Sequence, residues 1–100
     1  MEIANVFDRA EFSASKHVRT VLKEHDKFKT LVIGMEPGQE IPPCVMNSQT
    51  IFYVVQGSGT LTAGQERSPL IPGSIAFIPS GIERSVSCAE RMLLLAIQVH

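Results

Sequence analysis

Two turn signals enclose one short apolar run in the last third of the chain. Pro72-Gly73 precedes residues 74–78, which read Ser-Ile-Ala-Phe-Ile, and Pro79-Ser80-Gly81 follows them. Proline and glycine adopt the backbone angles that tight turns require. A run of about five mostly apolar residues between turns is typical of a buried strand and is too short for a helix. This stretch therefore predicts antiparallel β-structure built from hairpins.

The rest of the chain repeats this alternation of short β-rich runs and turn residues. Strands are expected at residues 16–24, 28–35, 45–46, 50–55, 60–63, 82–88 and 93–99, with a turn at residues 57–59. Pro42 and Pro43 cannot donate ladder hydrogen bonds, so their segment is expected at a sheet edge or rim. Residues 2–15 fit either a helical turn or an edge strand, anchored by Phe7 and Phe12. The pattern predicts one all-β sandwich or barrel domain spanning residues 1–100.

The composition excludes several classes of function. Nine Lys and Arg are balanced by ten Asp and Glu, which predicts no nucleic-acid partner. No apolar run approaches the ~20 residues of a membrane span, and the first residues lack the basic and apolar regions of a signal peptide. The two cysteines have no paired spacing. We therefore expect a cytoplasmic protein with free thiols and no membrane contact.

The glycine and proline spacing resembles the two signature motifs of the cupin family. Gly73, Pro79 and Gly81 match the second motif, G-x5-P-x-G, and Gly38 and Gly57 match the ends of the first, G-x5-H-x-H-x3-E-x6-G. The phrase between the motifs, residues 52–62, is also cupin-like. The resemblance spans residues 28–99, with the motifs at 38–88. It implies an RmlC-like antiparallel β-barrel (a double-stranded β-helix or jelly roll) after a short N-terminal extension.

The four positions that the cupin motifs assign to metal ligands hold Cys44, Met46, Thr50 and Arg84. Threonine is a weak neutral ligand, and the arginine cation cannot bind a metal. We therefore expect a degenerate site with no Fe, Mn or Zn cofactor. Cys44 and Met46 either fill the barrel interior as apolar packing or form a soft site for a metal such as Cu(I). A disulfide between Cys44 and Cys88 is a further, disfavoured alternative.

Arg84 has two interpretations. It is either a surface residue paired with Glu83 or Glu90, or, as the family register implies, a side chain inside the barrel. A buried guanidinium needs an acceptor, which could be Glu36, Glu40 or an anionic ligand. Residues of matching strand parity would form the apolar walls around it, namely Phe52, Val54, Phe77 and Val86. The three histidines are expected to be solvated or packed rather than catalytic: His17, His25 and His100.

These residues predict a non-catalytic module that binds or senses a small anionic metabolite. The alternative is an enzyme that is metal-free or uses a soft metal at Cys44 and Met46, and a third possibility is a structural domain that acts through dimer contacts. A two-fold homodimer is expected through the N-terminal third, because residues 17–23 and the apolar strand 93–99 would leave sheet edges uncovered.

Overall fold

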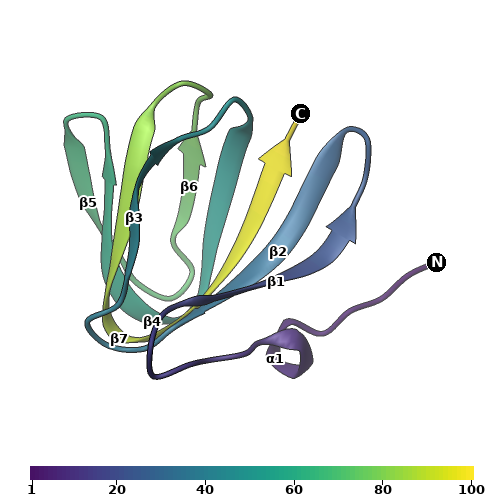
Figure 1. The fold of residues 1–100 in the computed structure, drawn as a ribbon, viewed down its shortest axis with the longest axis horizontal. Coiled ribbons are helices and arrows are strands. Elements are labelled where there is room, and N and C mark those ends of the chain that lie inside the picture. Colours follow the sequence, from purple (N-terminus) through teal and green to yellow (C-terminus); the bar gives the residue numbers. More distant parts are fainter.

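The computed structural model describes residues 1–100 and shows an antiparallel β-barrel. A short helix and seven strands follow one another along the chain: α1 (Val6–Arg9), β1 (Val18–Glu24), β2 (Phe28–Met35), β3 (Glu40–Val45), β4 (Gln49–Ala63), β5 (Glu66–Leu70), β6 (Ile75–Ile78) and β7 (Glu83–Val99). Figure 1 shows α1 outside the barrel and the C-terminus at the end of β7. The expected all-β fold is confirmed. No helix is long and apolar enough to cross a membrane.

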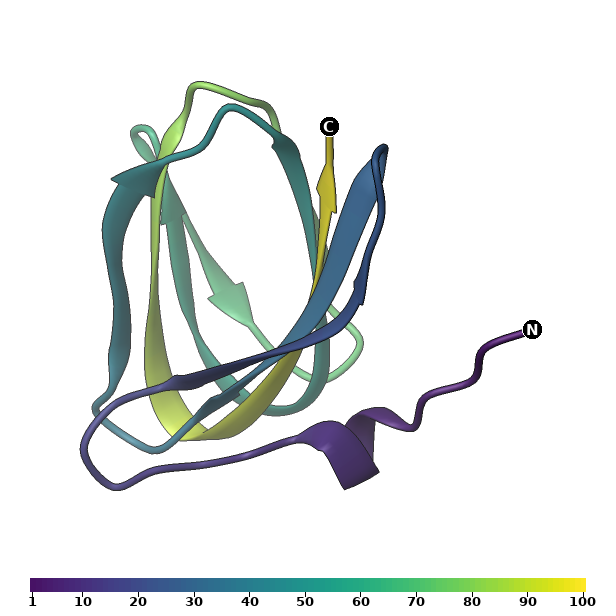
Figure 2. The same ribbon diagram turned by 45° about the vertical axis from the view of Figure 1, so that its right-hand side comes forward.

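The two long strands, β4 and β7, pair with each other and bend from one wall of the barrel to the other. The first half of β4 pairs with the second half of β7, and the remaining halves pair beyond the bend. We call the first wall β1, β2, the second half of β7, the first half of β4, and β6. The second wall is β3, the first half of β7, the second half of β4, and β5. Figure 2 shows strands of the two walls facing each other across the interior.

The bend in β4 corrects the turn expected at residues 57–59. This segment stays within one strand, and the pairing register with β7 shifts between Val54 and Gly59. A Cβ on Gly57 would collide with the carbonyl oxygen of Arg91, and one on Gly59 with that of Ser87. The glycines therefore allow two backbones to approach closely at the corner, which is the role of glycine in a bulged strand.

The last strand also differs from expectation. Residues 82–88 and 93–99 belong to one strand, β7, and they are separated by three exposed residues at the corner, Ala89 to Arg91. Its second half is central, because it pairs with β2 on one side and β4 on the other. The prediction that residues 93–99 leave an uncovered edge is therefore wrong, whereas β1 does lie at an edge.

The N-terminal segment and β3 follow the sequence more closely. Of the two interpretations of residues 2–15, the helical turn is correct: the Asn5 side chain accepts a hydrogen bond from the Phe7 backbone N–H at 2.9 Å and caps α1. β3 pairs only with β7, and its register is interrupted between Ile41 and Cys44, where the two prolines lie. Pro42 and Pro43 are thus at an edge, as expected.

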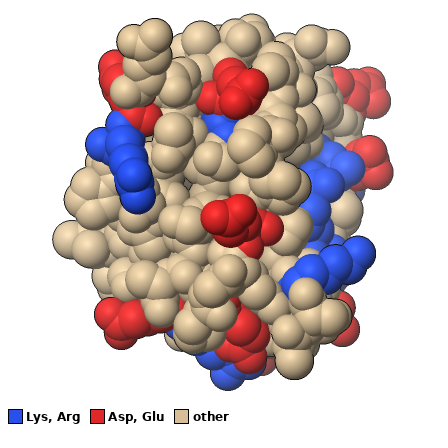
Figure 3. All heavy atoms as spheres, turned by 60° about the vertical axis from the view of Figure 1, so that its left-hand side comes forward, with Lys and Arg blue, Asp and Glu red and all other residues tan.

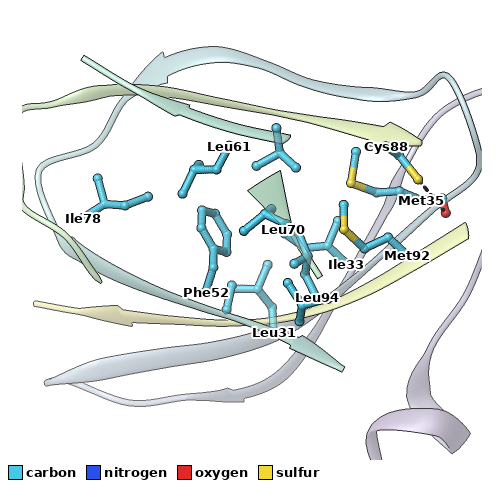
Figure 4. Close-up of a cluster of buried hydrophobic side chains, with 13 residues drawn as sticks. Leu31, Ile33, Met35, Phe52, Leu61, Leu70, Ile78, Cys88, Met92 and Leu94 are labelled. Carbon is cyan, nitrogen blue, oxygen red and sulfur yellow. Dashed lines mark hydrogen bonds between the residues drawn. The ribbon is translucent and has the colours of Figure 1, made fainter. Parts of the chain in front are cut away.

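A cluster of thirteen buried residues fills the space between the walls, and Figure 4 shows its side chains pointing toward one another. Most are aliphatic, and Met35, Met92 and Cys88 add sulfur atoms. The cluster includes Phe52, Val54 and Val86, so their predicted inward orientation is confirmed.

Candidate ligand-binding cavity

A cavity of about 240 Å³ opens into the barrel between the two walls. The first wall contributes side chains from β2, β4 and the second half of β7, and the second wall contributes side chains from β3 and the first half of β7. β1 and the residue before it also reach the cavity. Fifteen residues line it: His17, Arg19, Leu31, Ile33, Ile41, Pro42, Cys44, Met46, Thr50, Phe52, Arg84, Ser85, Val86, Ala96 and Gln98.

All four residues at the positions of the cupin metal ligands line this one cavity. Thr50 and Arg84 are buried, Met46 is half-buried and Cys44 is exposed. Cys44 and Arg84 lie directly opposite each other on β3 and β7. The cupin register therefore places these residues together as predicted. The interpretation of Cys44 as buried packing is wrong, because β3 is an edge strand and leaves its thiol accessible at the cavity.

Arg84 is buried with only 6% of its surface exposed, so the interpretation of a surface arginine is wrong. Its Nη1 atom is buried without a hydrogen-bond partner. Its guanidinium carbon lies 5.9 Å from the centre of the Phe52 ring on the first wall, so the side chain crosses the cavity from the second wall. No carboxylate pairs with it: Glu36 is paired with Arg91 at 3.2 Å, and Glu40 is exposed and forms no ion pair.

The cavity lining is positively charged. It includes Arg19 and Arg84 together with His17, and it includes no Asp or Glu. The Thr50 hydroxyl oxygen is also buried without a partner. Two unsatisfied polar groups in a small cavity are unusual, because buried polar atoms nearly always find hydrogen-bond partners. The lining therefore offers fixed positive charge and free hydrogen-bonding groups to a ligand.

The apolar walls of the cavity only partly match the prediction. Phe52 and Val86 line it, and Val54 lies deeper in the core. The prediction for Phe77 is wrong, because this residue is 70% exposed on the outside of the barrel. Directly opposed residues of paired strands share a face, and β6 pairs Ala76 with Phe52 and Phe77 with Ile51. Ala76 therefore points inward and Phe77 outward.

Arg19 and His17 were not assigned to the site from the sequence. The alternation of residues 17 to 23 shows that they share one face of β1, but the sequence does not show which face points inward. Pairing of Arg19 with Ile33, which lines the cavity, settles the face. The other two histidines lie elsewhere, as expected: His25 stacks on Phe28 and His100 contacts the Ser48 hydroxyl.

The residues at the positions that the cupin motifs assign to metal ligands do not fit a divalent metal. The structure contains no cluster of three or more His, Cys, Asp or Glu side chains that could hold one. Cys44 and Met46 are soft donors, but Arg84 opposite Cys44 brings a permanent positive charge to the same cavity. Two charges at about 4 Å repel by several kcal/mol at an effective dielectric near 20. The donor set is therefore unsuited to Fe, Mn or Zn.

Cys88 belongs to the core and not to the cavity. Both cysteines are free, so the Cys44–Cys88 disulfide is absent. The Cys88 thiol donates to the Glu90 carbonyl oxygen at 3.1 Å. It also approaches the Met35 carbonyl oxygen at 3.6 Å, the contact drawn in Figure 4. Burial raises the pKa of the Cys88 thiol, since an apolar environment disfavours the thiolate.

The surface shows no continuous basic region on the face drawn in Figure 3. Acidic groups lie near the middle of this face as well as at its periphery, basic groups lie mainly toward its sides, and uncharged atoms cover most of it. This pattern differs from the single-sign stripe that tracks a nucleic-acid backbone.

Comparison with known proteins shows that this chain belongs to the cupin domain family, whose profile matches residues 31–98. The solved structure of TT1209 from Thermus thermophilus is similar, with 25% identity, a TM-score of 0.94, and 99% of this chain and 97% of that one covered. An RmlC-like cupin from Desulfovibrio desulfuricans covers 99% of this chain and 96% of its own, with 20% identity and a TM-score of 0.90.

An enzyme shares the fold at lower coverage. The G106A mutant of salicylate 1,2-dioxygenase from Pseudoaminobacter salicylatoxidans is 17% identical, with a TM-score of 0.80, and the match covers 86% of this chain but 27% of that one. At this identity the likeness shows the fold alone. No curated protein matches the chain.

Proposed function

We propose that this cupin binds a small organic anion, without a metal, through the guanidinium of Arg84. The observation that supports the proposal is the buried Nη1 atom, which has no partner in a cavity free of carboxylates. A buried charge is tolerated when it is paired and hydrogen-bonded. An anionic ligand would supply the missing acceptor.

The groups around Arg84 indicate how the anion would be held. The planar guanidinium favours bidentate contact with a carboxylate or phosphate. Thr50 lies two residues before Phe52 on β4, on the same inward face, and its free hydroxyl is available as a second donor. The Phe52 ring beneath the guanidinium supports the cation from the opposite wall. An anion bound between these groups would be held in one orientation.

The size and walls of the cavity restrict the rest of the ligand. A volume of about 240 Å³ corresponds to about eight waters at ~30 Å³ each, so the ligand has on the order of ten non-hydrogen atoms. Leu31, Ile41 and Val86 form apolar parts of the lining. The ligand class is therefore a small carboxylate or phosphate ester with an apolar body, rather than a nucleotide.

The test is the change in melting temperature in a panel of citrate, sulfate, phosphate and small carboxylates. A ligand at a hundred times its Kd stabilises the folded state by about 2.7 kcal/mol. We expect at least one carboxylate to raise the melting temperature, Arg84→Lys to weaken the rise, and Arg84→Ala to abolish it. Arg67→Ala is the matched control, because Arg67 is exposed on β5 and does not line the cavity. A rise that Arg84→Ala leaves unchanged would refute the proposal.

The alternative function is catalysis, and the accessible Cys44 thiol across from Arg84 is the observation that supports it. A thiol beside a bound anion is positioned as a nucleophile, with or without a soft metal shared with Met46. Incubating the anion with the protein and recovering it unchanged supports the binding function. Conversion that stops in Cys44→Ser, with binding retained, would support the enzyme.

A further inference from the structure

The cavity contains a second guanidinium, that of Arg19. Binding of one anionic group by Arg84 leaves this second guanidinium without a partner. Arg19 lines the cavity from β1, on the opposite side of the first wall from β4. It forms no ion pair with any acidic residue. His17, two residues earlier on the same face, lines the cavity beside it. A cationic group is therefore present at two separate places in the lining.

A mostly apolar floor lies between β1, which carries Arg19, and Phe52 on β4. In the first wall the strand order is β1, β2, β7, β4, so two strands lie between Arg19 and Phe52. The side chains that these strands turn toward the cavity are Leu31, Ile33 and Ala96, together with the buried amide side chain of Gln98 near the end of β7. Neighbouring strands are about 4.8 Å apart, which places the backbones of β1 and β4 roughly 14 Å apart. The Arg84 guanidinium lies over the Phe52 end of this floor.

From this arrangement we propose that the ligand is a dicarboxylate whose two carboxylate groups are joined by a short apolar segment. This inference rests on the proposed function, since Arg84 binds the first carboxylate. Arg19 binds the second at the β1 side, and the apolar segment lies on Leu31 and Ala96. The lining has two guanidiniums and no acidic residue, and two negative charges on the ligand would neutralise them.

The arrangement makes Arg19 a specificity determinant rather than the main anchor. Arg84 is buried and has an unsatisfied donor, whereas Arg19 is exposed and can be hydrated when no ligand is bound. A monocarboxylate therefore needs only Arg84, and the second contact adds affinity for ligands long enough to reach β1. Exposed charge pairs contribute little, so we expect Arg19 to favour the dicarboxylate by about two- to fivefold.

The experiment is calorimetric titration with matched pairs of straight-chain acids. Dicarboxylates of four to eight carbons are compared with monocarboxylates of the same carbon number. They are titrated into the wild-type protein, Arg19→Gln, Arg84→Gln and the control Arg67→Gln. We expect a preference of about two- to fivefold for one dicarboxylate length over its matched monocarboxylate. Arg19→Gln should remove this preference by lowering the dicarboxylate affinity more than the monocarboxylate affinity, whereas Arg67→Gln should change neither affinity.

The outcomes separate this inference from the function on which it rests. If the wild-type protein binds both classes equally and Arg84→Gln abolishes both, the second anchor is wrong and the anion site stands. If Arg19→Gln lowers both affinities by the same factor, Arg19 provides general attraction, and the dicarboxylate proposal is again wrong. If no acid of either class binds, the dicarboxylate proposal is wrong; if phosphate and sulfate also fail to raise the melting temperature, the proposed function is wrong as well.

Discussion

Replacing Arg84 by methionine should stabilise the ligand-free protein and at the same time abolish anion binding. Methionine is unbranched and flexible, so it can follow the path of the arginine side chain across the cavity toward Phe52. It removes the buried Nη1 donor that has no partner. A residue retained only for folding would show the opposite effect, because removing it would destabilise the fold.

The magnitude follows from two opposing contributions. Leaving a buried donor unsatisfied costs about 1–3 kcal/mol, and more for a charged group. The contact of the guanidinium with the Phe52 ring at 5.9 Å offsets about 0.5–2 kcal/mol of this. Replacing buried ionic groups by apolar ones of similar size has stabilised other proteins by about 1–4 kcal/mol. We expect Arg84→Met to raise the free energy of unfolding by about 1–2 kcal/mol.

The assay is urea denaturation in a zwitterionic buffer, with melting temperature as a second measurement. A gain of 1 kcal/mol raises the melting temperature of a domain of this size by roughly 4–8 °C. Arg91→Met is the control, because Arg91 pairs with Glu36 at 3.2 Å and stacks on Phe12 at 3.7 Å. Arg91→Met should lower the free energy of unfolding by about 0.5–1.5 kcal/mol. A loss of stability in Arg84→Met of similar size would refute the reasoning, since Arg84 would then be a structural residue.

Three further predictions concern metal, thiols and assembly. Elemental analysis of the purified protein should find substoichiometric Fe, Mn, Ni and Zn. A folded variant that combines Cys44→His, Met46→His, Thr50→Glu and Arg84→His should gain affinity for divalent metals. No gain would show that these four positions do not converge. One thiol, Cys44, should react rapidly in the folded protein and be lost in Cys44→Ser, because Cys88 is buried with a raised pKa. The protonated Cys88 thiol stabilises the fold fully below the ordinary thiol pKa, and this contribution is lost as the pH rises through the folded-state pKa, a dependence that Cys88→Ala should remove. We expect a two-fold dimer formed through the N-terminal third, where β1 has an unpaired edge, and light scattering measures its mass. An 11.0 kDa monomer would contradict this prediction. A dimer that Phe77→Asp disrupts would show instead that the interface lies on the outside of β6.

The sequence predicts the barrel and the convergence of Cys44, Met46, Thr50 and Arg84 because spacing within a motif carries strand parity and turn positions together. Within β7 this parity persists over the whole strand, since the even-numbered residues from Arg84 to Gln98 are buried except Glu90 at the corner. The continuity of β7 was missed because the polar corner interrupts the apolar pattern. Local patterns therefore show which residues share a face, even where they misplace the ends of a strand.

The parts that the sequence does not predict depend on pairing between strands. The register of β6 with β4 determines which side chains of β6 point inward. A turn separates β6 from each neighbouring strand in the chain, so strand parity cannot be counted across it. This is why the sequence placed Phe77 on the wrong side of the barrel wall. Arg19 was missed for the same reason, because only its pairing with Ile33 shows that it faces the cavity. The bulge of β4 at Gly57 and Gly59 could not be predicted for the same reason. These glycines make room for the backbone of β7, which is distant in sequence.

An arginine in place of a metal ligand changes what the barrel can do without removing its central positive charge. The motif resemblance assigns position 84 to a histidine that would hold a cation, whereas here the side chain is the cation. A metal offers open coordination positions and can polarise or oxidise what it binds. A guanidinium offers only hydrogen-bond donors in a fixed plane, and it remains charged at every physiological pH. Under the proposed function, an arginine at this position keeps the attraction for anionic oxygen atoms but uses hydrogen bonding in place of coordination, which favours reversible recognition of an anion over metal-dependent turnover.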